Sequence, residues 1–202
     1  MHSVSNLLTK LNLATRRWHA DVDDPWLELM RPDVSQADYL AQLVRMYGLV
    51  APFESACLYT RGVTKLLEYR QLLRAGLIAQ DIIALGVTPN QVSRIATCPA
   101  ITMFRDIGEA LGWLYVVERS TLLQDGVKRH LLEKRPELAN ACAYLSAYEG
   151  HVSDHWLAFG RMLDRAAAQL DVEESILSSA EEAFGHTKQW LMVTRATSRT
   201  AG

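Results

Sequence analysis

Apolar residues return at intervals of three and four positions along nearly the whole chain, without a long alternation of β-branched and polar residues. This spacing places the apolar side chains on one face of a helix. We therefore predict an all-α protein. The predicted helices cover residues 5–23, 38–59, 64–75, 78–85, 102–133 and 172–195, with two more after Pro136 and Gly150.

Capping and helix-breaking residues set the predicted ends of these helices. Pro25 follows the first helix, which we expect to stop before it, because proline cannot donate a backbone hydrogen bond. Ser35 is a good N-cap for the second helix, in which Pro52 predicts a kink. Gly86 and Pro89 then separate the shorter helices from a loop that leads to the long central helix.

The chain has 202 residues, of which 49% are hydrophobic, enough for one well-buried core. We predict a single domain over residues 1–202, with frayed ends at 1–4 and 196–202. The net charge of −2 gives no electrostatic reason to expect nucleic acid or an anionic membrane as a partner, so we expect neither.

The three cysteines, Cys57, Cys98 and Cys142, are widely spaced among apolar residues. Their odd number and surroundings indicate reduced packing residues. The first residues lack the architecture of a secretion signal, and no uncharged apolar run reaches the roughly 20 residues that span a bilayer. We therefore expect a cytoplasmic protein.

The most informative segment is LGWLYVVERSTLLQDGVKRHL, residues 111–131. It resembles the distal helix of bacterial heme oxygenases, most closely the branch that supplies biliverdin to bacterial phytochromes, where the pattern is approximately LYVLEGSTLGGQ with a basic end. The matching positions are Leu114, Tyr115, Val116, Glu118, Ser120, Thr121, Leu122, Arg129, His130 and Leu131. Where that family has glycine, this chain has Arg119, Leu123 and Gln124. The resemblance implies a single-domain, heme-oxygenase-like helical bundle that sandwiches a planar ligand.

Glycine has no Cβ, so a helix backbone that carries it can lie close to a flat ligand. Arg119 and Leu123 are four positions apart and project from one helical face. If that face points at the pocket, both side chains occupy the oxygen side of the heme. Ser120, by resemblance, helps hold the water network that delivers protons during oxygen activation, although a polar residue beside a helix bend has the same sequence signature.

His19 lies in the segment LATRRWHADVDD, which resembles the first helix of the family, and the resemblance implies that it is the proximal iron ligand. A single histidine on an amphipathic helix is by itself more often structural. An imidazole suits heme iron because one nitrogen binds the metal while the other N–H hydrogen-bonds a second group. Asp23 and Glu54 are both candidates for that acceptor.

The resemblance also implies that Arg129 binds a heme propionate, with Arg16 or Arg17 as a second cation. Basic residues on helices are usually only solvated. Phe184 resembles an aromatic residue that lines the pocket, with core packing as the alternative. A separate set of His151, Asp154 and His155 has the spacing of metal ligands on one helical face, a weak signal for a di-iron site.

Two functions follow from these residues. The first is oxidative cleavage of heme to biliverdin, iron and CO, with heme as substrate and cofactor. Electrons would come from an external reductase or ferredoxin-type donor, since the chain lacks a glycine-rich nucleotide motif, and a bacteriophytochrome is a candidate partner. The alternative is a catalytically degenerate module with an occluded pocket that binds a ligand or regulates a partner. His19 favours the enzyme, and the replaced glycines favour the module.

Overall fold

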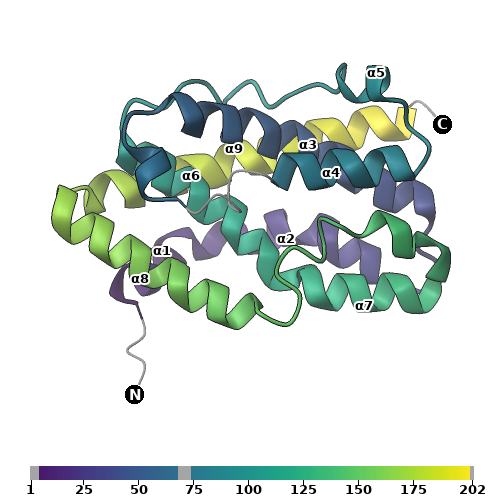
Figure 1. The fold of residues 1–202 in the computed structure, drawn as a ribbon, viewed down its shortest axis with the longest axis horizontal. Coiled ribbons are helices and arrows are strands. Elements are labelled where there is room, and N and C mark those ends of the chain that lie inside the picture. The colour runs from purple at the N-terminus through teal and green to yellow at the C-terminus, as the bar shows by residue number, and fades with distance from the viewer. Residues whose placement is uncertain (1–4, 68–73, 201–202) are drawn as a thin grey trace.

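The computed structural model describes residues 5–67 and 74–200, and within them every regular element is helical (Figure 1). The all-α prediction is therefore confirmed. The α-helices are α1 Asn6–Thr15, α2 His19–Leu27, α3 Gln36–Tyr59, α4 Arg74–Ala84, α5 Pro89–Val92, α6 Ile107–Arg119, α7 Gln124–Lys134, α8 Val152–Leu170 and α9 Glu173–Thr200. The 3₁₀ turns are η1 Arg16–Trp18, η2 Glu28–Met30, η3 Val63–Lys65, η5 Ser120–Leu123 and η6 Pro136–Ala141.

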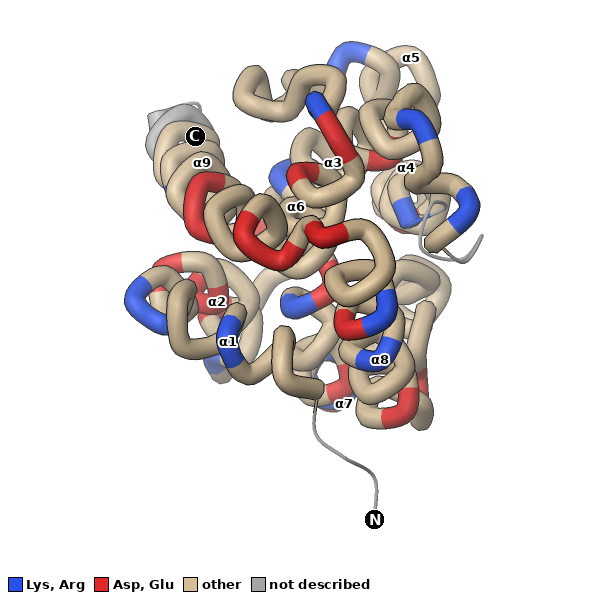
Figure 2. The backbone as a smooth tube through the Cα atoms, turned by 90° about the vertical axis from the view of Figure 1, so that its left-hand side faces the viewer, with Lys and Arg blue, Asp and Glu red and all other residues tan. Residues whose placement is uncertain are grey.

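Helix α9 runs along most of the molecule and packs against α6, while α3 and α4 form a neighbouring pair (Figure 1). Helices α1 and α2 also contact α9, and α8 packs on α1. Acidic and basic residues are interspersed over these helices (Figure 2). The helical spacing of Ile176, Ala180, Phe184, Thr187 and Leu191 predicts that they share one inner face of the last helix. The structure confirms this prediction, because all five are buried.

Gly112 lets α6 approach α9 closely. A Cβ built on Gly112 would lie 2.7 Å from the backbone nitrogen of Ala180 and 2.7 Å from Cβ of Ser179. The two helices therefore touch through their backbones at this point. This contact positions α6, which contains the first part of the segment that resembles the distal helix.

The predicted first helix is divided in the structure, and its predicted end is wrong. Helix α1 stops at Thr15, the 3₁₀ turn η1 follows, and α2 then continues through Pro25 to Leu27. Pro25 lies in the last turn of α2, where its missing N–H removes a single helical bond. Pro25 and Trp26 are both buried, and this apolar burial offsets the loss.

The predicted central helix over 102–133 is also divided. It starts only at Ile107, after an N-cap at Asp106, and the turn η5 separates α6 from α7. Two hydroxyls explain the turn: Ser120 Oγ donates to the carbonyl of Val117 at 2.7 Å, and Thr121 Oγ1 donates to the carbonyl of Glu118 at 2.7 Å. Such bonds compete for backbone carbonyls and bend a helix. The bend therefore forms without any glycine between residues 119 and 124.

The remaining boundaries differ in detail. The predicted helix over 64–75 is represented by η3, and residues 68–73 lie outside the described part of the chain. Helix α4 is described from Arg74, four residues before its predicted start. The predicted cap at Ser35 is confirmed, because Ser35 and Asp38 form a reciprocal capping box.

Both chain ends were expected to fray. Helix α9 continues to Thr200, five residues past the predicted end at Arg195, whereas residues 1–4 lie outside the described part. In the part of the chain that the structure describes, none of the helices combines the length and hydrophobicity needed to cross a membrane.

Candidate functional site

His19 is the first residue of α2 and is half-buried. Its ring lies 5.4 Å, centroid to centroid, from the fully buried ring of Phe184 on α9. The ring of Tyr115 on α6 lies 6.0 Å, centroid to centroid, from the ring of the same phenylalanine. Two residues that the resemblance assigns to the pocket, from segments far apart in the chain, therefore meet beside α6.

The hydrogen-bond partner of His19 is Thr15, one helical turn earlier. Thr15 Oγ1 lies 2.9 Å from His19 Nε2, and the same hydroxyl donates to the carbonyl of Leu11 at 2.7 Å. A hydroxyl has a single hydrogen, so Thr15 accepts the bond from Nε2–H of His19. The neutral imidazole then carries its lone pair on Nδ1.

The two carboxylates considered as acceptors for His19 are engaged elsewhere, so that expectation is corrected. Glu54 accepts the backbone N–H of Ala75 at 2.9 Å, and burial raises the pKa of its carboxyl group. Asp23 binds Arg119. The acceptor that the sequence analysis missed is Thr15, whose only sequence signal is its position four residues before His19.

Arg119 and Asp23 form a two-pronged ion pair between α6 and α2. Arg119 Nη1 lies 2.5 Å from Asp23 Oδ1, and Nη2 lies 2.8 Å from Oδ2. The two side chains are only 14% and 16% exposed. Parallel N–H···O bonds of this kind are both strong and directional. The pair therefore ties the end of α6 to the helix that carries His19.

Arg119 also changes the electrostatics of His19. Burial lowers the pKa of the imidazole, repulsion by Arg119 lowers it further, and Asp23 opposes these effects. The neutral ring is thereby favoured, which is the form that a metal ion requires.

The other distal residues lie around the bend. Leu123 is half-buried and packs against the core. Gln124 is buried. Ser120 is also buried and lies near the hydroxyl of Tyr144, in the segment before α8. The structure thus turns Ser120 toward Tyr144 while Arg119 reaches α2.

The basic residues assigned to heme propionates are both exposed. Arg16 lies on η1, three positions before His19. Arg129 lines a separate cavity of about 490 Å³ with residues of α7 and of the turn before α8: Asp125, Lys128, Leu132, Glu149 and Gly150. Arg16 is thus close to His19 along the chain, and Arg129 lies on the face of α7 that this turn covers.

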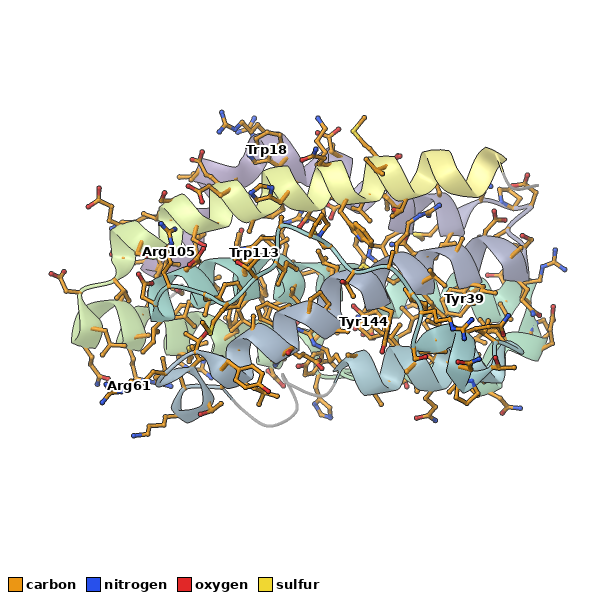
Figure 3. All side chains as sticks on the ribbon, turned by 90° about the horizontal axis from the view of Figure 1, so that it is seen from above. Trp18, Tyr39, Arg61, Arg105, Trp113 and Tyr144 are labelled. Atoms are coloured by element: carbon orange, nitrogen blue, oxygen red, sulfur yellow. The ribbon has the colours of Figure 1, made fainter. Side chains whose placement is uncertain are left out.

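Glu118 is the centre of a buried polar cluster. Its Oε1 lies 2.7 Å from Arg74 Nη2, and its Oε2 lies 2.6 Å from His155 Nε2. The ring of His155 stacks on Tyr148 with centroids 3.8 Å apart. The cluster borders Tyr144, which is fully buried among the helices (Figure 3). The sequence could not predict that Arg74 binds Glu118, because 44 positions separate the two residues.

The proposed metal set of His151, Asp154 and His155 is not supported. Among the described residues, no group of three or more His, Cys, Asp or Glu side chains is arranged to hold a metal ion. His155 is instead bonded to Glu118.

His19 is half-buried, whereas Phe184 and Tyr115 beside it are fully buried. An imidazole and two aromatic rings are residue types that suit a flat apolar ligand, but such a ligand reaches the two rings only when the helices that cover them move apart. The pair of Arg119 and Asp23 also joins α6 to α2. A macrocycle between these two helices therefore requires the pair to separate.

Comparison with known proteins identifies a family for this chain. The family model described as heme oxygenase matches residues 5–192, which is nearly the whole chain. The comparison with proteins of curated function returned no match. By the extent of the family match, the chain belongs to the heme oxygenase family.

Proposed function

We propose that this protein is a heme-degrading enzyme that converts heme to biliverdin, iron and CO, with heme as both substrate and cofactor. The observation that carries the proposal is the position of His19, neutral and half-buried, beside Phe184 and one turn from Asp23. Bound heme supplies the oxygen-activating iron, and the electrons come from an external reductase or ferredoxin-type donor.

Each proposed site residue has one task. His19 ligates the iron, and Phe184 packs beside it. Arg129 and Arg16 hold the propionates through their planar guanidinium groups. Ser120 passes protons to the distal side, because its hydroxyl lies between the bend and Tyr144.

A second candidate is a catalytically degenerate member of the family that binds a ligand or regulates a partner such as a bacteriophytochrome. The Arg119–Asp23 pair supports this candidate, because Arg119 and Leu123 stand where the resemblance to the bacteriophytochrome-associated branch implies glycine. Without those glycines, the oxygen side of the pocket is narrower. The three buried, unpaired cysteines are compatible with a cytosolic setting for either function.

Titration of the purified protein with hemin, followed by its Soret absorbance, tests binding. His19→Ala should change the ferric spectrum and weaken binding, whereas His130→Ala and His155→Ala should leave the spectrum as it is. If His19→Ala has no effect while either of the other two abolishes the spectrum, the proximal assignment is wrong.

Turnover separates the two candidates. Heme-loaded protein supplied with a reductase and oxygen should form biliverdin, seen by its red absorbance. Arg119→Gly with Leu123→Gly should increase the rate, although two central glycines cost roughly 1–2 kcal/mol of helix stability. Efficient turnover by the wild type with no gain in the variant would show that these side chains do not obstruct the pocket. No turnover by either protein would favour the degenerate module.

A further inference from the structure

A small cavity of about 200 Å³ lies along α8, and its lining contains none of the residues proposed to bind heme. Its polar lining residues are His155, Arg161 and Arg165, all on α8, and its other lining residues are apolar. Pockets for drug-sized ligands have roughly 300–1,000 Å³. The cavity is therefore large enough only for a small ligand.

Two arginines give this cavity a positive charge. Arg161 and Arg165 are four positions apart, so they are neighbours on one face of α8, where like charges destabilise a helix slightly. Asp164 lies between them in the sequence, but it accepts the backbone N–H of Leu7 at 2.9 Å and so contacts α1. Among the residues that the structure describes, neither arginine forms an ion pair with a carboxylate. An anion in the cavity would offset both charges.

His155 forms a fixed part of the cavity wall. Its side chain is 13% exposed, its Nε2 lies 2.6 Å from Glu118 Oε2, and its ring stacks on Tyr148. Because a carboxylate only accepts hydrogen bonds, Nε2–H of His155 donates to Glu118. Arg74 binds the other oxygen of Glu118 at 2.7 Å and offsets its negative charge. The carboxylate behind His155 therefore adds little repulsion toward an anion in the cavity.

We propose that Arg161, Arg165 and His155 form a binding site for a phosphate group. A guanidinium group donates two parallel hydrogen bonds to phosphate oxygens, and a tetrahedral phosphate has enough oxygens for two such groups. A carboxylate has only two oxygens, both of which one guanidinium group engages. The small volume restricts the ligand to inorganic phosphate or a small phosphomonoester.

The first test uses the full chain without heme. Sodium phosphate is added at fixed pH and ionic strength while ¹H–¹⁵N spectra follow the backbone amides of α8 and the arginine Nε–H groups. These signals should shift to saturation at millimolar phosphate. Sodium acetate should bind about tenfold more weakly or worse, because it can satisfy only one of the two guanidinium groups. Acetate binding as tight as phosphate binding would overturn the assignment to phosphate.

Glycerol 3-phosphate distinguishes the two sources of the phosphate group. If it binds more tightly than inorganic phosphate, the ligand is a phosphomonoester. If it binds more weakly, the ligand is inorganic phosphate. Either order supports the site, whereas the absence of saturable binding by both compounds would overturn it.

The second test uses variants of the two arginines. Arg161→Gln and Arg165→Gln should each weaken phosphate binding by roughly 10–100-fold, the usual effect of removing one charged, hydrogen-bonded contact. Arg94→Gln is the matched control, because Arg94 is also exposed and follows α5, which lies on the opposite side of the molecule from α8 (Figure 1). It removes the same charge and should leave the dissociation constant within about twofold of the wild type, since distant surface charges are screened.

The outcome does not depend on correct prediction of stability or of heme chemistry. Arg161 and Arg165 are exposed, so both glutamine variants should unfold at the wild-type temperature. Phosphate should shift the Cε1–H signal of His155 in the wild type but not in the double variant Arg161→Gln with Arg165→Gln. If both single variants bind phosphate as tightly as the wild type, the cavity is not its binding site. Because no heme is added, this result is independent of the proposed function.

Discussion

The buried pair of Arg74 and Glu118 allows a quantitative prediction of stability. The side chains are 1% and 0% exposed, and Arg74 Nη2 lies 2.7 Å from Glu118 Oε1. Glu118→Gln keeps the size of the side chain and removes its charge. Arg74 is then left as a buried cation without its charged partner, a state that costs several kcal/mol.

The expected loss is about 3–5 kcal/mol in the free energy of unfolding, the range measured when one partner of a buried ion pair is removed. For a domain of this size, 1 kcal/mol shifts Tm by roughly 2–4 °C, so Tm should fall by about 6–20 °C. The second bond of Glu118, 2.6 Å to His155 Nε2, favours the upper part of these ranges.

Urea unfolding followed by circular dichroism at 222 nm measures this loss. Lys10→Met is the control, because its ion pair with Glu173 is 44% and 42% exposed and should contribute at most about 1 kcal/mol. Arg74→Met with Glu118→Leu should be less destabilised than Glu118→Gln, since no unpaired charge stays buried. A loss below about 1 kcal/mol in Glu118→Gln would show that the pair is not desolvated as the structure indicates.

Three further predictions concern other parts of the molecule. The hydrogen bonds from Ser35 hold the pKa of Asp38 below 3.8, so Asp38→Asn should cost about 1 kcal/mol at pH 7. Because a carboxyl group with a lowered pKa stabilises only while ionised, urea unfolding should show this difference shrinking as pH falls below 3.8. Gly112→Ala should lower the free energy of unfolding by about 1–3 kcal/mol, because its Cβ clashes with the α9 backbone. Gly185→Ala should raise it by about 0.5–1 kcal/mol, because a Cβ there meets nothing within 4 Å. Thermal unfolding distinguishes the two signs. Arg129→Ala should weaken hemin binding by about 1.5–3 kcal/mol, and an unchanged dissociation constant would remove Arg129 from the proposed site.

The sequence by itself determined the helical class of the protein, the cap at Ser35 and the buried face of α9. Each of these depends on residues within a few positions of one another, because apolar periodicity and capping act over one or two helical turns. The resemblance around His19 and Arg119 identified the family for the same reason, since short stretches of chain carry its pattern. The sequence did not show which residues of these two segments are in contact.

The tertiary structure alone decided which partners these residues have. Arg119 binds Asp23 across 96 positions, and Glu118 binds Arg74 across 44. Such pairs form only when helices pack, because no local pattern records which charged groups become close. The bend at Ser120 was also visible only in the structure. The apolar periodicity of the sequence continues through this residue, whereas the structure shows that the hydroxyls of Ser120 and Thr121 donate to backbone carbonyls. Helix packing thus decides which carboxylate is available to His19.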